Sequence, residues 1–165
     1  MTHWKEIIRN ADALISENKI AEAVVLMESA LFENPDVALL HNNIGWAYLH
    51  HLEDPERAFV HLEYAAKIDP RLVSVRIHLA TYWNHKGLYR LAETELRAAL
   101  EGENPDRPYI LFLLARNYEL MTEWNLATRT YKEALMETTV EWQFGEITNG
   151  LRRVRKKRLN ALLPF

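Results

Sequence analysis

A short motif recurs along the chain at a nearly constant interval, and this period limits the fold more than any other feature of the sequence. Three prolines lie 35 residues apart: Pro35, Pro70 and Pro105. A pair of small or apolar residues comes just before each of them and returns once more downstream, as Ala30-Leu31, Ala65-Ala66, Ala99-Leu100 and Ala134-Leu135. Such an internal period predicts similar structural units stacked side by side.

Each unit also carries small residues at two fixed positions. The first set is Ala11, Gly45, Ala80 and Ala115, and the second is Ala23, Ala58, Ala92 and Ala127. Two antiparallel helices can approach closely where their contact residues are small. We therefore interpret Gly45 as a contact residue whose helix penalty of about 1 kcal/mol is offset by packing. Gly45→Ala should then be tolerated, whereas Gly45→Leu should force the helices apart.

Composition agrees with helices joined by short connections. Only five glycines occur in 165 residues, and there is no cysteine, which excludes disulfides and thiolate chemistry. No apolar run approaches the roughly 18 residues that cross a bilayer. The charged N-terminal stretch lacks the apolar core of a signal peptide. We expect a cytoplasmic protein.

The pattern resembles the tetratricopeptide repeat (TPR), a helix-turn-helix unit of about 34 residues. The stretches that carry the resemblance are "IGWAY" at 44–48, "RAFVHLEYAAKIDP" at 57–70, "KGLYRLAETELRAALE" at 86–101 and "TEWNLATRTYKEALME" at 122–137. Thr122 and Asn18 stand where a turn glycine is usual. The resemblance implies an all-α, right-handed superhelical solenoid. Residues 1–141 should hold four repeats, at about 4–37, 38–72, 73–107 and 108–141.

The remaining segment, 142–165, has no partner repeat and is expected to be a basic amphipathic capping helix. Its apolar residues fall on one stripe at helical spacing: Phe144, Ile147, Leu151, Val154 and Leu162. A stack of repeats ends in an exposed apolar face, and such a helix would cover it. Gly150 in the middle of the segment could interrupt the helix.

The sequence contains no recognisable catalytic, cofactor-binding or metal-binding motif. There is no glycine-rich phosphate loop and no Gly-X-Ser-X-Gly element. His50 and His85 could approach each other through stacking, but no two histidines on one helix have the spacing of a metal-binding pair. We expect a protein that is not an enzyme and has no cofactor.

The TPR resemblance implies a concave groove, lined by the first helix of each repeat, that holds a peptide or a partner helix. The groove residues predicted on this basis are Lys5, Asp12, Leu39, Asn42, Trp46, Ile77, Thr81, Tyr109, Phe112 and Arg116. Trp46, Tyr109 and Phe112 are large aromatics at positions that packing alone does not require. Aromatic residues and arginine dominate interface hot spots.

Three interpretations of the groove follow. The first is an adaptor or assembly scaffold for a protein partner. The second is a TPR-type chaperone for a secreted or assembling subunit. The third is a groove filled by the chain's own terminal helix or by a second copy in a homodimer.

Charge is divided unevenly along the chain. Residues 1–140 carry a net charge of −7, whereas residues 141–165 carry +4. The basic residues Arg152, Arg153, Lys156 and Lys157 are predicted to face away from the apolar stripe. They form either a solvated face or a contact face for an acidic protein surface, such as that of a second copy. Contact with nucleic acid or anionic lipid is a third interpretation, which the acidic body makes less favourable for nucleic acid.

Overall fold

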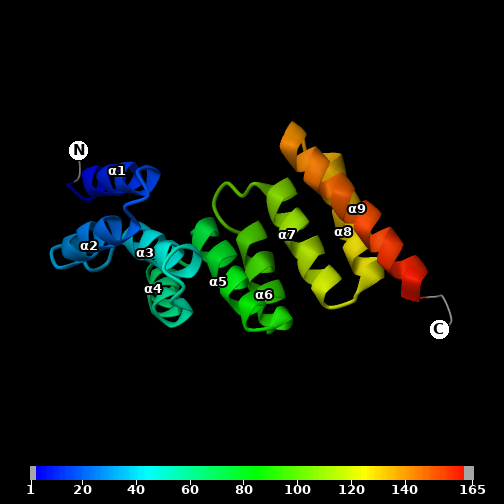
Figure 1. The fold of residues 1–165 in the computed structure, drawn as a ribbon, viewed down its shortest axis with the longest axis horizontal. Helices are drawn as coiled ribbons and strands as arrows, with labels where there is room; N and C mark the ends of the chain where they lie inside the picture. Colours follow the sequence, from blue (N-terminus) through cyan, green and yellow to red (C-terminus); the bar gives the residue numbers. More distant parts are fainter. Residues whose placement is uncertain (1–2, 162–165) are drawn as a thin grey trace.

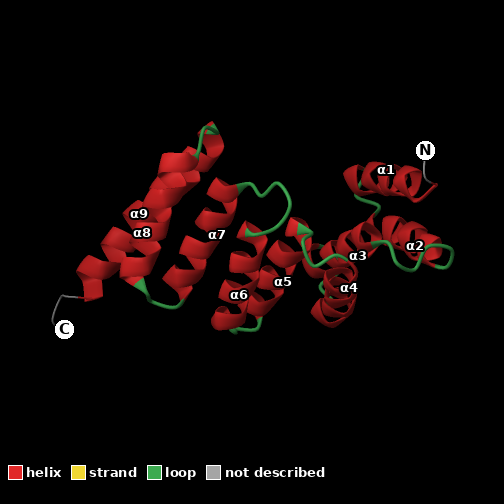
Figure 2. Cartoon of the chain, turned by 180° about the vertical axis from the view of Figure 1, so that it is seen from behind, coloured by secondary structure: helices red, strands yellow, loops and turns green. Residues whose placement is uncertain are grey.

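The computed structural model describes residues 3–161, which form nine α-helices and no strand (Figure 1). The helices are α1 (His3–Ser16), α2 (Ile20–Leu31), α3 (Ala38–His50), α4 (Pro55–Ile68), α5 (Val73–His85), α6 (Tyr89–Leu100), α7 (Arg107–Leu120), α8 (Trp124–Glu137) and α9 (Glu141–Ala161). The first eight form four hairpin pairs that follow one another along an extended molecule. Figure 2 shows the same succession from behind. The fold is the all-α TPR solenoid that the repeat register predicts.

The four turns within the pairs share one backbone feature. Each contains a residue with positive φ, namely Asn18, Glu53, Gly87 and Thr122. In three of them the next residue's N–H donates to a carbonyl five positions earlier, as in Leu88 to Trp83 at 2.9 Å. This arrangement closes a helix end with a left-handed residue, which glycine adopts without strain. Only one of the four positions is a glycine.

Two of the helices begin with an aspartate cap and a proline in the first turn. The Asp54 carboxylate accepts from the Arg57 N–H at 3.0 Å, and Asp106 accepts from the Tyr109 N–H at 3.2 Å. Proline is favoured at such starts because its missing N–H would have no helical partner there. These caps fix where α4 and α7 begin.

Gly45 lies at the closest approach of α3 and α4. A Cβ atom added there would lie 2.6 Å from Leu62 Cγ and 3.2 Å from the Ala58 carbonyl oxygen. The structure therefore agrees with a demand for a small side chain. The expectation that Gly45→Ala is tolerated is wrong, because the methyl group needs the branched carbon of Leu62, which is fully buried, to move.

The buried apolar residues form two clusters that meet at α5. Val75, Leu79 and Tyr82 belong to the cluster built by α1–α4, whereas Ala80 belongs to the cluster of the later helices. Trp83 is half-buried and packs against both. Helix α5 therefore joins the two halves of the molecule.

Helix α9 is continuous across Gly150 and packs against α8 and α7 (Figure 2). Its buried residues are Gln143, Ile147, Gly150 and Val154. A Cβ on Gly150 would lie 2.5 Å from Tyr131 Cζ, so this glycine permits a close helix contact much as Gly45 does. The prediction that Phe144 belongs to the buried stripe is wrong, because 53% of this residue is exposed. Leu162 lies outside the described residues.

Candidate functional site

The first helices of the pairs leave a gap between α5 and α7. Helix α3 packs on α5 and α7 packs on α9, but α5 and α7 are not among the closely packed pairs. A pocket of about 260 Å³ opens there, and we call it the α5–α7 pocket. It is lined by Ile77, Ala80, Thr81, Asn84, His85, Leu96, Leu113, Arg116 and Leu120. Within residues 3–161, no α9 side chain lines this pocket, so the terminal helix does not fill it.

Three of the predicted groove residues meet in this pocket. Ile77 and Thr81 enter from α5 and Arg116 from α7. Arg116 is exposed, and its guanidinium carbon lies 5.7 Å from the centre of the Phe112 ring. Within residues 3–161 it forms no ion pair. The pocket therefore holds a cation that can bind an external acid.

Asn84 adds a second polar feature to the pocket. Its side-chain oxygen is buried and has no hydrogen-bond partner within the described part of the chain. An unmet acceptor of this kind costs about 1–3 kcal/mol and favours a ligand that brings a donor. Thr81 is different, since its hydroxyl donates to the Ile77 carbonyl at 3.0 Å.

On the N-terminal side, α3 and α5 present an indole and several imidazoles. Trp46 is half-buried, and its ring lies 4.7 Å from that of His51 and 6.0 Å from that of His50. His78 is hydrogen-bonded to the Asn42 side-chain oxygen at 3.1 Å. Burial, with a smaller contribution from the charge of His50, lowers the pKa of His78 to about 4. His78 is therefore uncharged at physiological pH.

Two other predicted groove residues on α3 are less accessible than expected. Asn42 is 4% exposed, and both ends of its side-chain amide are hydrogen-bonded. The amide oxygen is bonded to His78, and the amide nitrogen donates to the Asn43 side-chain oxygen at 2.9 Å. Leu39 is half-buried. Asn42 therefore positions His78 and offers almost no surface of its own.

The prediction that packing alone does not require an aromatic residue at Phe112 is wrong. Phe112 is 7% exposed and belongs to the C-terminal cluster, with its ring 6.2 Å from that of Tyr131. Tyr109 is half-buried between Phe112, at 6.4 Å, and Trp142, at 5.9 Å. Packing therefore does require an aromatic residue at position 112.

Lys5 and Asp12 lie apart from the rest of the predicted groove. Both are exposed on α1, two helix pairs before α5. The Lys5 ammonium lies 5.4 Å from the centre of the Trp4 ring. The structure brings neither residue to the α5–α7 pocket.

Glu119 forms a buried charged cluster with two cations of α9, and the sequence did not predict this contact. The residue is 5% exposed and accepts from Arg153 at 2.7 and 2.8 Å and from Lys157 at 2.8 Å. The Tyr131 hydroxyl donates to it at 3.2 Å. Burial alone would raise the pKa of Glu119, but the hydrogen bonds from the two cations outweigh it and lower the pKa to about 2. This cluster fastens α9 to α7.

The cluster also corrects the predicted basic face. Arg153 and Lys157 do not point away from the apolar stripe, because both reach Glu119 on α7. Arg152 and Lys156 are exposed. The one available signal in the sequence is Glu119 itself, the only acidic side chain of α7.

Within residues 3–161 no three histidine, aspartate or glutamate side chains converge in a way that could hold a metal ion. None of the described helices combines the length and the apolar character needed to cross a bilayer. The pocket, the indole and the exposed arginine are thus the features that bear on function.

Several solved structures share this arrangement of helices. PilW, described as a widely conserved type IV pilus biogenesis factor, has a TM-score of 0.84 at 16% identity, over 94% of this chain and 70% of its own. The chain has the TPR fold. Pseudomonas aeruginosa PilF has a TM-score of 0.80 at 17% identity, over 93% of this chain and 69% of its own. Human IFIT1, solved as a dimer with PPP-AAAA, has a TM-score of 0.80 at 24% identity, and the chain spans only 38% of its length. No protein-family model and no curated protein matches the sequence.

Proposed function

We propose that this protein is a non-enzymatic adaptor or assembly scaffold that binds a segment of a partner protein in the α5–α7 pocket. One observation carries the proposal. Apolar walls, an exposed arginine and a buried acceptor without a partner converge in one pocket on the face of the first helices. Sites that bind peptides combine apolar contact with a few polar groups that fix orientation.

The pocket defines the chemistry of the segment. Ile77, Leu96 and Leu113 favour one apolar side chain of moderate size, since the volume is about 260 Å³. Arg116 favours a carboxylate beside it, because an arginine pairs well with a planar acid. Asn84 favours an N–H or hydroxyl donor. The partner segment therefore carries an apolar residue flanked by an acid.

Trp46 supplies the second contact, on the N-terminal side of the face. Its indole is half-buried and lies beside two histidines, so it offers a firmly held aromatic surface. Such residues often dominate binding energy. A segment that spans α3 to α7 would contact both Trp46 and Arg116.

Protein partners fit this surface better than nucleic acid does. Residues 1–140 carry a net charge of −7, and burial lowers the pKa values of His50 and His78 on this face. A phosphate backbone requires several cations along its path. PilW is described as a type IV pilus biogenesis factor, which supports an assembly function. The proposal includes a cytoplasmic location and no catalytic activity.

Selection from a random peptide library displayed on phage tests the proposal. We expect the selected peptides to share an apolar residue next to Asp or Glu, and Arg116→Glu to weaken their binding by about tenfold or more. Arg9→Glu, an exposed arginine on α1, is the matched control and should bind normally. Peptides that lack an acid, or that bind Arg116→Glu unchanged, would contradict the proposal.

A further inference from the structure

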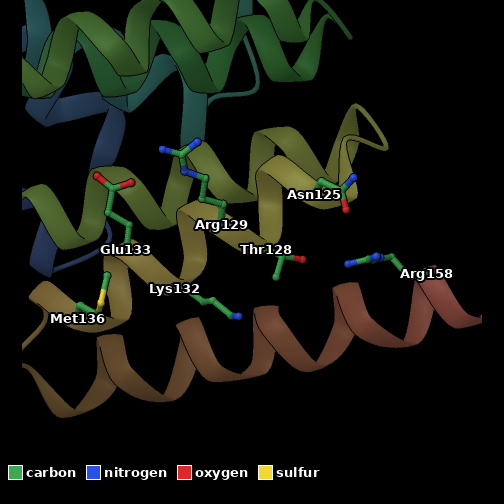
Figure 3. A pocket seen from close by; sticks show the side chains of 7 residues that line it. All are labelled: Asn125, Thr128, Arg129, Lys132, Glu133, Met136 and Arg158. Atoms are coloured by element: carbon green, nitrogen blue, oxygen red, sulfur yellow. The ribbon is translucent and has the colours of Figure 1, made fainter.

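The outer side of α8 and α9 forms an apolar groove with basic edges. The α8–α9 groove has a volume of about 480 Å³ and is lined by Thr128, Lys132, Leu151, Arg155, Arg158 and Leu159. A second hollow of about 610 Å³ continues it along α8. Figure 3 shows Thr128 and Lys132 pointing from α8 toward α9, with Arg158 reaching back from α9.

The cations of this groove are not used within the fold. No ion pair within residues 3–161 involves Lys132, Arg155 or Arg158. Residues 151–161 contain six basic and no acidic side chains. Arg153 and Lys157 are neutralised in part by Glu119, but the groove side of α9 is not. An occupant of this groove should therefore be acidic as well as apolar.

A surface with those properties lies at the other end of the molecule. On α2 and the turn that follows it, the residues Glu22, Val25, Ser29, Phe32 and Glu33 are exposed and share one side by helical spacing, which we call the α2 face. Val25 is 64% exposed and Phe32 is 91% exposed. Residues 17–36 contain five acidic side chains and one basic one. Val25 and Phe32 thus give this acidic stripe two exposed apolar side chains that a partner surface could cover.

We propose that the α2 face of one copy docks into the α8–α9 groove of the next copy. Val25 and Phe32 would contact Leu151 and Leu159, while Glu22 and Glu33 would face Lys132 and the arginines. The apolar contact supplies affinity, and the charges fix orientation and speed association.

The position of the two surfaces sets the form of the assembly. Helices α2 and α9 lie at opposite ends of the solenoid in both views (Figures 1 and 2). The α2 face of a molecule therefore cannot reach the α8–α9 groove of the same molecule. A contact between two different surfaces does not close with two copies and generates an open chain or a ring. The α5–α7 pocket takes no part in the contact, so the inference is independent of the proposed function.

Sedimentation velocity over a range of protein concentrations tests the proposal. The average mass of the wild type should rise with concentration beyond a dimer and fall with added salt, because salt screens the charges. Val25→Asp should weaken self-association by about tenfold or more, and so should Arg155→Glu. A wild type that stays monomeric, or that stops at a dimer, would overturn the proposal.

Matched controls separate the contact from a general effect of charge. Val60→Asp on α4 replaces a valine that is 65% exposed, and it should assemble like the wild type. Arg152→Glu changes an exposed arginine of α9 that does not line the groove, and it should also assemble.

A mixing experiment tests the pairing of the two surfaces. Val25→Asp retains its groove and Arg155→Glu retains its α2 face, so the two variants together should form heterodimers and nothing larger. A mixture that remains monomeric would contradict this pairing. If Val25→Asp and Val60→Asp weakened assembly equally, the α2 face would be excluded as the contact.

Discussion

Helices α5 and α7 are equivalent helices of successive repeats, 35 residues apart. Their equivalent side chains nevertheless differ in whether they line a pocket or are buried. Ile77 and Asn84 on α5 line an open pocket. Their counterparts on α7, Phe112 and Glu119, are buried next to α8 and α9. A first helix followed closely by another helix loses its free face, whereas one followed by a gap retains it. The repeat position alone therefore does not make a residue a binding residue.

The largest expected difference in stability is between alanine variants of the apolar pair, Phe112 and Ile77. Phe112→Ala should lower the free energy of unfolding by about 3–5 kcal/mol, because it leaves a cavity in the core. Ile77→Ala removes a half-buried side chain at the pocket wall and should cost about 1–2 kcal/mol. Urea unfolding of both variants measures the difference. Equal losses would mean that Phe112 is not a core residue.

Alanine variants of the polar pair, Glu119 and Asn84, should also differ in stability. Glu119→Ala should cost about 2–3 kcal/mol, less than a fully buried pair, because Arg153 and Lys157 are each nearly half exposed and can turn to solvent. Asn84→Ala removes an acceptor without a partner and should be close to neutral. Melting curves at neutral pH compare the two.

The pH dependence of Glu119 follows from its lowered pKa. Since the folded pKa of about 2 lies below the ordinary value of 4.5, the contribution is complete above pH 4.5 and is lost as the pH falls toward 2. The wild type and Glu119→Ala should therefore converge in stability at strongly acidic pH. A constant difference from pH 7 to pH 2 would contradict the assignment.

His78 on α5 and Leu113 on α7 form the third pair. The pKa of His78 is lowered to about 4, so its contribution is present above pH 6.5 and is lost as the pH falls toward 4. The equivalent residue of α7 suggests the variant His78→Leu, which should retain about 2 kcal/mol more of its neutral-pH stability at pH 5 than the wild type does. If the two proteins lost the same stability between pH 7 and pH 5, protonation of His78 would not be the cause of the loss.

The turns that follow the two helices give the smallest predicted difference. Gly87 after α5 and Thr122 after α7 have φ values of 72° and 58°. A β-branched residue is strained there, so Thr122→Gly should raise stability by about 1 kcal/mol and Gly87→Thr should lower it similarly. Melting temperatures of both variants measure the effect. A destabilised Thr122→Gly would indicate a stabilising contact of the threonine side chain.

The fold is predictable from the sequence because each repeat requires small residues at the same helix contacts. The small residues at Gly45, Ala80 and Ala115 recur where two helices meet, and that spacing is visible without coordinates. Gly45 also shows the limit of this reasoning. The tightness of its contact depends on Leu62, whose rotamer no periodic pattern reports.

The candidate site is less predictable because it depends on distances between repeats. Thr81 and Arg116 are 35 residues apart and could have been separated by packed side chains rather than by a pocket. The rotation of α9 about its axis decides which cations face Glu119, and this rotation depends on the buried contacts of α9, such as that of Gly150 with Tyr131. These are tertiary contacts, which the spacing of residues in the sequence does not reveal.

The central claim is that the α5–α7 pocket receives a partner segment. A map of backbone amide chemical shifts, recorded while a selected peptide is added, tests it most directly. The largest changes should occur at the pocket residues Ile77, Thr81, Asn84, Leu113 and Arg116, with smaller changes around Trp46. Changes confined to the exposed faces of α2, α4 or α6, with the pocket residues unmoved, would contradict the account.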